Sequence, residues 1–195
     1  MAGTTCATAQ DYFNTMAELL KQLDPAPIDQ FTELLDKARR NGASVYVFGN
    51  GGSAYNASHY VTDFVKTASV EGEPRLKAVS VVDNYGMTTA LGNDISYEDT
   101  FVYPLESYAK AGDVAVAISC SGNSPNIVKA CKWAKDNGLS VVAISGFKGG
   151  RMAEFADIHI NVPHDNYGVI EDVHLSVGHI VAQGVFERAK AGKSA

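Results

Sequence analysis

The sequence predicts an α/β fold: a three-layer, doubly wound sandwich around a five-stranded parallel sheet, preceded by an N-terminal helical hairpin. Five short apolar runs rich in Val and Ile follow residue 42. Most of them do not alternate with polar residues, which is typical of strands buried on both faces of a parallel sheet. Helical stretches separate the runs, as crossover connections require. With 195 residues, 46 % hydrophobic and 19 % charged, residues 1–195 are expected to form one domain.

The individual elements follow from these patterns. The expected strands are residues 45–48, 78–82, 114–118, 141–144 and 158–162. The expected helices between and after them are residues 54–66, 100–109, 124–137 and about 169–190. Ligands of such a sheet bind at the carboxyl ends of its strands, so the loops after residues 48, 82, 118 and 162 are the places to look for chemistry.

Residues 1–42 predict two helices before the first strand. Apolar residues recur there at intervals of three and four, from Tyr12 to Leu23, which indicates an amphipathic helix. The segment Asp24-Pro25-Ala26-Pro27 breaks it, and residues 28–40 supply a second helix that ends at Asn41-Gly42. Their apolar stripes have no obvious place on the central sheet, so we expect them to form an oligomer interface.

Charge and composition exclude several classes of protein. The formal net charge of −6 and the absence of a basic cluster argue against binding to nucleic acid. No apolar run approaches the roughly 20 residues that span a bilayer, and the first residues lack the pattern of a secretory signal. The three cysteines, Cys6, Cys120 and Cys131, form no CxxC pair and predict no disulfide framework. A cytoplasmic protein that binds neither membrane nor nucleic acid is expected.

A glycine loop, Gly49-Asn50-Gly51-Gly52-Ser53-Ala54, follows the first expected strand and opens a helix. Its spacing matches G-x-G-x-x-A, a pattern of dinucleotide-binding turns. The acidic residues about twenty positions on, Glu71 and Glu73, lie in a Gly/Pro loop, whereas the acid that binds the ribose belongs at a strand end. The sequence therefore argues against NAD, and no nucleotide cofactor is expected.

A serine loop, Ser119-Cys120-Ser121-Gly122-Asn123-Ser124, follows the third expected strand. A helix begins there, and a helix N-terminus offers unpaired N–H groups and a partial positive charge to an anion. One serine at a helix start is an ordinary N-cap. Three hydroxyls in six residues, with Gly122 permitting a close approach, predict a phosphate site instead. Cys120 is expected to be a small loop residue and not a nucleophile, because no base is apparent beside it.

Two helices each carry a histidine and a carboxylate. His59 and Asp63 are four apart and project from one face of the helix that the glycine loop opens, while Glu171 and His179 share a quadrant of the last helix. These four could shuttle protons between adjacent carbons, or hold a divalent metal, or be solvated polar residues. His159 and His174 are expected to be ordinary polar positions.

With these motifs assembled, the chain resembles the phosphoheptose isomerase branch of the sugar isomerase (SIS) domain family over essentially its whole length. The segments that carry the resemblance are residues 49–53, His59, Gly92-Asn93-Asp94, the serine loop and the helix from Glu171 to His179. The resemblance implies the SIS sandwich and a homotetramer with active sites at subunit interfaces.

The resemblance also implies a reaction, the isomerisation of sedoheptulose 7-phosphate to D-glycero-D-manno-heptose 7-phosphate through an enediol, for nucleotide-heptose synthesis. Catalysis would fall to Asp63 or Glu171 as base and to His179. The residues implied to bind substrate are Asn50, Gly51, Gly52, Ser53, Asn93, Asp94, Ser119, Cys120, Ser121, Ser124 and Glu171. The positions at which some members bind zinc are His59, Asp63, Glu171 and His179.

Three positions depart from the family pattern. The family has glutamate at 63, glutamine at 171 and threonine at 120, where this chain has Asp63, Glu171 and Cys120. A displacement of about 1 Å in an active site can cost on the order of a hundredfold in rate. The carboxylate function is therefore expected to be shared or transferred between 63 and 171. The alternative is a non-catalytic SIS module that senses a sugar phosphate or binds a partner protein, as replication-initiator regulators do.

Overall fold

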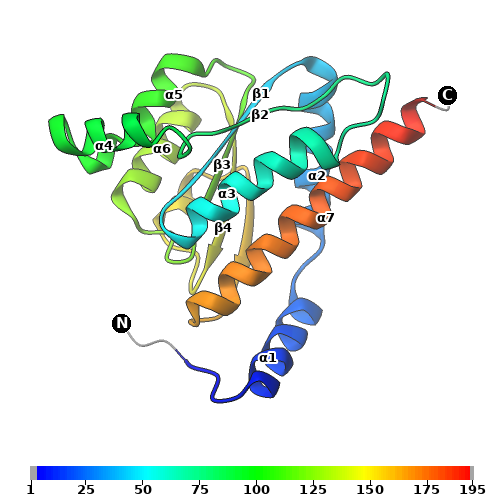
Figure 1. Ribbon diagram of the computed structural model, residues 1–195, viewed down its shortest axis with the longest axis vertical. Helices are drawn as coiled ribbons and strands as arrows, with labels where there is room; N and C mark the ends of the chain where they lie inside the picture. Colours follow the sequence, from blue (N-terminus) through cyan, green and yellow to red (C-terminus); the bar gives the residue numbers. More distant parts are fainter. Residues whose placement is uncertain (1–3, 194–195) are drawn as a thin grey trace.

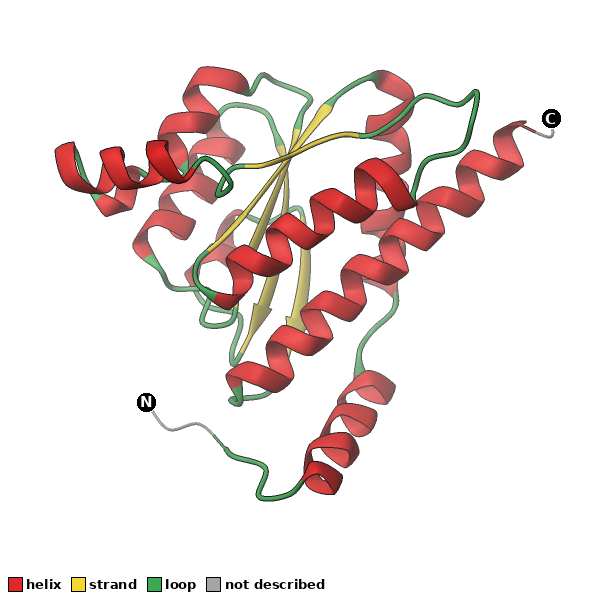
Figure 2. Ribbon diagram, viewed as in Figure 1, coloured by secondary structure: helices red, strands yellow, loops and turns green. Residues whose placement is uncertain are grey.

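A computed structural model describes residues 4–193 and has the expected parallel sheet at its centre (Figures 1 and 2). The strands are β1 (Ser44–Gly49), β2 (Lys77–Ser80), β3 (Val114–Ser119), β4 (Ser140–Gly146) and β5 (Ile158–Val162). Their order in the sheet is β2-β1-β3-β4-β5, and every neighbouring pair is parallel. The predicted fold class is confirmed.

Helices cover both faces of this sheet. The α-helices are α1 (Ala9–Gln22), α2 (Ala26–Asn41), α3 (Gly52–Thr62), α4 (Tyr85–Asp94), α5 (Val102–Tyr108), α6 (Pro125–Asp136) and α7 (Tyr167–Lys193). Shorter turns are the π-helix η1 (Asp63–Thr67) and the 3-10 helices η2 (Tyr97–Asp99) and η3 (Arg151–Phe155). In Figure 1, α2, α3 and α7 lie on one side of the sheet and α5 and α6 on the other.

Alternate strand residues face the two helical layers. Val45 and Val47 of β1 pack in one core with α2, α3 and α7, whereas Tyr46 and Phe48 pack in a second core with α5 and α6. This alternation follows from the two-residue period of a strand. Both faces are apolar because both are covered, and this explains the continuous Val/Ile runs of the sequence.

The two N-terminal helices have different roles, and this corrects the expectation for the second. The apolar face of α2 is buried within the chain itself, where Phe31 and Leu35 are fully buried beside Val45 and Val47. This apolar face is therefore part of the chain's own core. In contrast, α1 lies apart from the sheet beside the start of α7 (Figure 1) and leaves Phe13 exposed.

Several predicted boundaries were wrong. The helix expected at 124–137 is α6, but the one expected at 54–66 changes from α to π form at Asp63. α2 begins at Ala26, inside the expected break, because proline fits the first turn of a helix, where its missing N–H has no helical partner. The helix α4 was missed because its sequence has only a weak amphipathic pattern and a single buried residue, Leu91.

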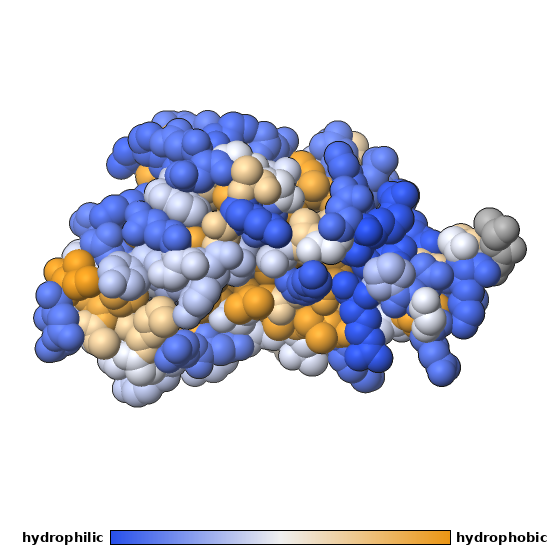
Figure 3. Space-filling view, turned by 90° about the horizontal axis from the view of Figure 1, so that it is seen from above, coloured by the Kyte–Doolittle hydropathy of each residue, from blue (hydrophilic) through white to orange (hydrophobic). Residues whose placement is uncertain are grey.

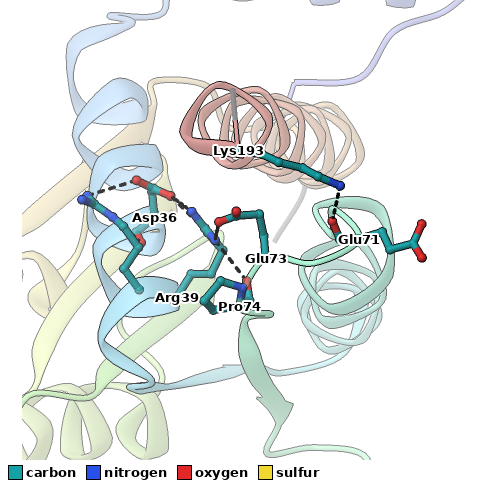
Figure 4. Close-up of polar contacts among 7 residues, drawn as sticks. Asp36, Arg39, Glu71, Glu73, Pro74 and Lys193 are labelled. Atoms are coloured by element: carbon teal, nitrogen blue, oxygen red, sulfur yellow. Dashed lines mark hydrogen bonds and ion pairs between the residues drawn. The ribbon is translucent and has the colours of Figure 1, made fainter. Parts of the chain in front are cut away.

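A buried ion-pair network ties the loop between α3 and β2 to α2 (Figure 4). The guanidinium of Arg39 donates to Asp36 Oδ1 (2.8 Å), to Glu73 Oε2 (3.3 Å) and to the Pro74 carbonyl (3.2 Å). Lys193 donates to the Glu71 carbonyl from the end of α7. The two acids that a dinucleotide site would need thus lie in a structural loop, in agreement with the argument against NAD.

The face opposite the strand carboxyl ends is largely hydrophilic, with apolar residues in separate patches (Figure 3). Within residues 4–193, no helix combines the length and the apolar character needed to cross a bilayer.

Candidate active site

The strand order places a topological switch point between β1 and β3. Connections leave these two neighbouring strands toward opposite faces of the sheet, so their carboxyl ends open a crevice in which ligands of such sheets bind. β1 ends at Gly49 and β3 at Ser119, and Gly49 pairs with Ile118 in the sheet register. The glycine loop and the serine loop therefore begin side by side.

Three of the four predicted acid–base residues converge where the end of α3 packs against α7. Asp63 Oδ2 lies 2.9 Å from His179 Nδ1 and 3.4 Å from His59 Nε2. The two imidazole rings are perpendicular to each other, with centroids 4.9 Å apart. Asp63 is buried, whereas each histidine side chain is 45 % exposed. A buried carboxylate is thus capped by two imidazoles that ligands can reach.

Close packing of α3 on α7 produces this convergence. The ring of Tyr60 packs against Gly178 of α7, and its hydroxyl donates to the carbonyl of His174. A Cβ at Gly178 would overlap the same ring, so only glycine allows this approach. Because Tyr60 neighbours His59 and Gly178 neighbours His179, the contact also sets the distance between the two histidines.

Glu171, the fourth predicted residue, lies away from the other three and between the two loops. Its carboxylate rests against Gly52, where a Cβ would overlap it, and it accepts a long contact of 3.9 Å from the Cys120 thiol. Asn56 of α3 donates to its backbone carbonyl (2.9 Å). Burial, and then the charge of neighbouring Asp172, raise the pKa of the Glu171 carboxyl above its ordinary value.

The serine loop presents its hydroxyls unequally. Ser119 is buried, and its Oγ accepts the N–H of Gly122 (3.2 Å), while Ser121 is half-buried and its Oγ accepts the N–H of Asn123 (3.3 Å). Ser124 is the N-cap of α6, yet its hydroxyl makes no capping hydrogen bond. Ser121 and Ser124 are therefore the hydroxyls best placed to meet a ligand.

Cys120 of the serine loop and Ser53 of the glycine loop are both buried. Burial and the nearby Glu171 carboxylate raise the pKa of the Cys120 thiol to about 12. The thiol therefore stays protonated at neutral pH, as expected for a loop residue that is not a nucleophile.

A cavity of about 510 Å³ adjoins the serine loop on its β4 side. Its lining includes Ser121 and Asn123 from the serine loop, and Lys148, Arg151 and Tyr167 from the segments after β4 and β5. Asn123 Oδ1 accepts the Arg151 N–H (3.0 Å), so the two loops form one wall. The sequence analysis missed these two cations, although a Gly/Lys/Arg loop after a strand was a visible signal.

The remaining predicted residues divide into two groups. Asn50 belongs to the crevice, where it exchanges hydrogen bonds of 2.9 and 3.0 Å with Asn126 and accepts the Tyr97 hydroxyl (3.0 Å). Asn93 and Asp94 are exposed at the end of α4, where Asn93 donates to Asp94 (2.7 Å). Within the described residues their side chains make no hydrogen bond to either loop.

The converging residues suit a metal ion. Asp63 Oδ2 is buried and accepts no hydrogen bond within residues 4–193, an unusual state for a carboxylate oxygen. The donor atoms of His59, Asp63 and His179 lie within 4.8 Å of one another. Zinc binds such atoms at about 2.0–2.2 Å, so two ligands of one ion are at most about 4.4 Å apart, and small side-chain rotations suffice. Glu171 is not among these three, and its role as a ligand stays a prediction.

Comparisons with known proteins agree with this fold. The SIS domain family matches this chain over residues 11–146. The chain is 34 % identical to a probable phosphoheptose isomerase of Thermoplasma acidophilum over 180 residues, which covers 92 % of this chain and 98 % of that protein. It is 35 % identical to a phosphoheptose isomerase of Rhodospirillum rubrum over 185 residues, 94 % of each chain.

Solved structures show the same likeness. A phosphoheptose isomerase from Francisella tularensis superposes with a TM-score of 0.84 at 26 % identity, covering 91 % of this chain and 94 % of that one. The corresponding enzyme of Neisseria gonorrhoeae gives a TM-score of 0.81 at 29 % identity, covering 90 % and 93 %.

The chain is thus an SIS-domain protein, with its glycine and serine loops at the β1/β3 switch point. Within that class it belongs to the phosphoheptose isomerase family and is a phosphosugar isomerase. The resemblance found in the sequence is confirmed, and the alternative of a non-catalytic module is not favoured.

Proposed function

We propose that this chain interconverts sedoheptulose 7-phosphate and D-glycero-D-manno-heptose 7-phosphate through an enediol. The observation that carries the proposal is the grouping of His59, Asp63 and His179 where α3 packs against α7, together with Glu171 between the two loops of the switch-point crevice. An aldose–ketose isomerisation needs one group that removes a proton from carbon and another that serves the neighbouring oxygens. These residues supply both.

Of the two candidate bases, the contacts favour Glu171. Asp63 is already engaged with two histidines, whereas the carboxylate of Glu171 faces the crevice at Gly52. Its raised pKa makes it a stronger base than an ordinary carboxylate. In the forward direction Glu171 takes a proton from C1 while O2 gains one, forming the enediol. C2 is then protonated as O1 loses its proton, which leaves an aldehyde at C1.

His179 is the group we assign to the oxygens. It lies eight residues after Glu171 on α7, about 12 Å along the helix, so the two side chains act on one sugar only if they come from different subunits, as active sites at the interfaces of the proposed tetramer allow. The Nδ1 of His179 faces Asp63, which fixes the ring and leaves Nε2 free to exchange a proton with O1 or O2.

The 7-phosphate is assigned to the serine loop. Ser121, Ser124 and the N–H groups at the start of α6 suit a phosphate, since a helix N-terminus attracts anions. Lys148 and Arg151 line the adjoining cavity and add the positive charge that the loop itself lacks.

Zn²⁺ is proposed as the metal of this site, held by His59, Asp63 and His179. Three protein ligands with an open position are typical of catalytic zinc, which would polarise the carbonyl and enediolate oxygens as a Lewis acid.

A homotetramer in the cytoplasm is proposed for the assembly and location. Phe13 and Leu20 of α1 are 64 % and 42 % exposed, which is unusual for residues of an amphipathic stripe unless a second subunit covers them. The three cysteines are unpaired, as is usual in a reducing compartment. Light scattering coupled to gel filtration tests the assembly, and a monomer would contradict it.

The decisive experiment is NMR of sedoheptulose 7-phosphate incubated with the protein, with and without a chelator. New aldoheptose signals are expected, and in D₂O deuterium should enter the product at C2. The Glu171→Gln variant should give neither the aldoheptose signals nor deuterium at C2. If no heptose forms in either condition, the proposed function is wrong.

A further inference from the structure

Thr67 makes a contact that no part of the proposed mechanism uses. Its hydroxyl donates to Asp63 Oδ1 at 2.9 Å. Threonine in a helix ordinarily returns its hydroxyl to the backbone carbonyl four residues earlier, as Thr62 does with Ser58 (3.2 Å). Thr67 instead donates to the side chain four residues earlier.

The backbone around this contact is also unusual. Residues Asp63–Thr67 form a π-helical turn, in which the N–H of Ala68 donates to the carbonyl of Asp63 (2.8 Å). Such turns are rare and are found mostly at functional sites, where they change the direction of side chains. Here the turn starts at the residue that lies under both histidines.

The two oxygens of Asp63 therefore have separate surroundings. Oδ1 accepts the hydroxyl of Thr67, and Oδ2 faces His179 Nδ1 and His59 Nε2. A carboxylate held at one oxygen cannot rotate without losing that hydrogen bond, so Oδ2 stays directed at the histidines. This matters more for an aspartate than for the family's glutamate, because its shorter side chain must reach the same neighbours.

We propose that Thr67 is a positioning residue: its hydroxyl fixes the Asp63 carboxylate and, through it, the ring orientation of His59 and His179. The inference deepens the proposed function, on which only its kinetic readout rests. Partners that orient the first ligands of a metal or the catalytic groups typically contribute about 10- to 100-fold in affinity or activity.

Three variants test this. Thr67→Val keeps the branched shape and removes the hydroxyl, and Thr67→Ser keeps the hydroxyl. Thr62→Val is the matched control, because it removes an exposed threonine hydroxyl of the preceding helical turn whose acceptor is backbone. Since Thr67 is itself exposed, none of the three should disturb the core.

Histidine ring ¹H–¹⁵N correlation spectra are the primary readout, since they need neither substrate nor metal. Thr67→Val should shift the ring nitrogens of His59 and His179, and Thr67→Ser and Thr62→Val should leave them close to the wild type. In kinetics, Thr67→Val should lower kcat by about 10- to 100-fold with little change in KM, and serine should restore it. Zn²⁺ affinity, measured by chelator competition, should fall in parallel.

Unchanged ring signals in Thr67→Val would overturn the proposal. The proposal would also be overturned if Thr67→Ser lost as much activity as Thr67→Val, because the hydroxyl would then not be what positions Asp63. If the wild type fails to isomerise the heptose phosphate, the proposed function fails, but the ring spectra still decide the role of Thr67.

Discussion

At the scale of single residues, Gly52 and Glu171 depend on each other. The carboxylate of Glu171 occupies the space that a side chain at residue 52 would take. Gly52 is the first residue of α3 and lies outside the left-handed region of φ, so its role here is to leave room. A methyl group there would displace Glu171 while leaving its carboxylate in the protein.

The variant Gly52→Ala is therefore expected to keep its fold and lose activity. The atoms in the way belong to the end of a flexible side chain, which can rotate aside. Displacing a proton-transfer group by about 1 Å can cost on the order of a hundredfold in rate, so kcat should fall strongly while the melting temperature changes little. Wild-type kcat would show that Glu171 does not act from its present position.

His174 is the second residue with a measurable consequence, and it was expected to be an ordinary polar position. It is fully buried, its Nε2 lies 2.9 Å from the Ser145 carbonyl, and its Nδ1 has no hydrogen-bond partner within the described residues. Nε2–H therefore donates, and the ring is neutral. Burial lowers the pKa of His174 to about 4, an effect that the Ser145 carbonyl partly opposes.

Stability should consequently fall as the pH drops below the ordinary histidine pKa. Above pH 6.5 the ring is neutral in both states, and between 6.5 and about 4 only the unfolded chain gains the proton. Over that window the loss should amount to about 3 kcal/mol. Urea unfolding of wild type and His174→Gln at several pH values checks this, and equal pH dependence in both proteins would contradict it.

At the scale of elements, the crossing of α3 and α7 determines the site. His59 and Asp63 come from one helix and His179 from the other, and Tyr60 against Gly178 sets their separation. The change from α to π form at Asp63 occurs at this crossing.

Gly178→Ala should separate the two helices. Overpacking of this kind typically costs about 1–3 kcal/mol, and the loss of activity should be larger than that instability explains, because His179 moves away from Asp63. Gly192→Ala is the matched control: it lies in the same helix, and nothing in residues 4–193 comes within 4 Å of the added methyl. It should be neutral or stabilising by up to about 1 kcal/mol. Thermal unfolding and kcat of both variants test the difference.

At the scale of the whole molecule, Arg39 joins α2 to the loop that leads into β2. It is 4 % exposed and bonds Asp36, Glu73 and the Pro74 carbonyl. Arg39→Ala leaves the buried Asp36 with only the exposed Arg40 and removes the donor that Glu73 and the Pro74 carbonyl share, so it should cost about 3 kcal/mol. The control is Arg40→Ala. Arg40 pairs with the same Asp36 but is 60 % exposed, so its removal should lower the free energy of unfolding by at most about 1 kcal/mol. Similar losses in both variants, measured by denaturant unfolding, would contradict the network's role.

Much of this molecule could be predicted from its sequence, because the signals were local. Five strands, the helices between them and both ligand loops follow from apolar runs and from Gly and Ser at strand ends. The π turn and α4 could not be predicted, since neither leaves a periodic pattern. The core position of α2 was missed because an amphipathic stripe does not reveal what will cover it.

By itself the sequence determined the fold class, the positions of the glycine and serine loops and the residue types able to exchange protons, since these depend on residue type and spacing. Only the tertiary structure decided how those residues are grouped. It joined His59, Asp63 and His179, and it placed Glu171 between the loops against Gly52. The reason is physical: spacing gives the face of a helix on which a residue lies, whereas the distance between two helices is set by packing, here a glycine against a tyrosine ring.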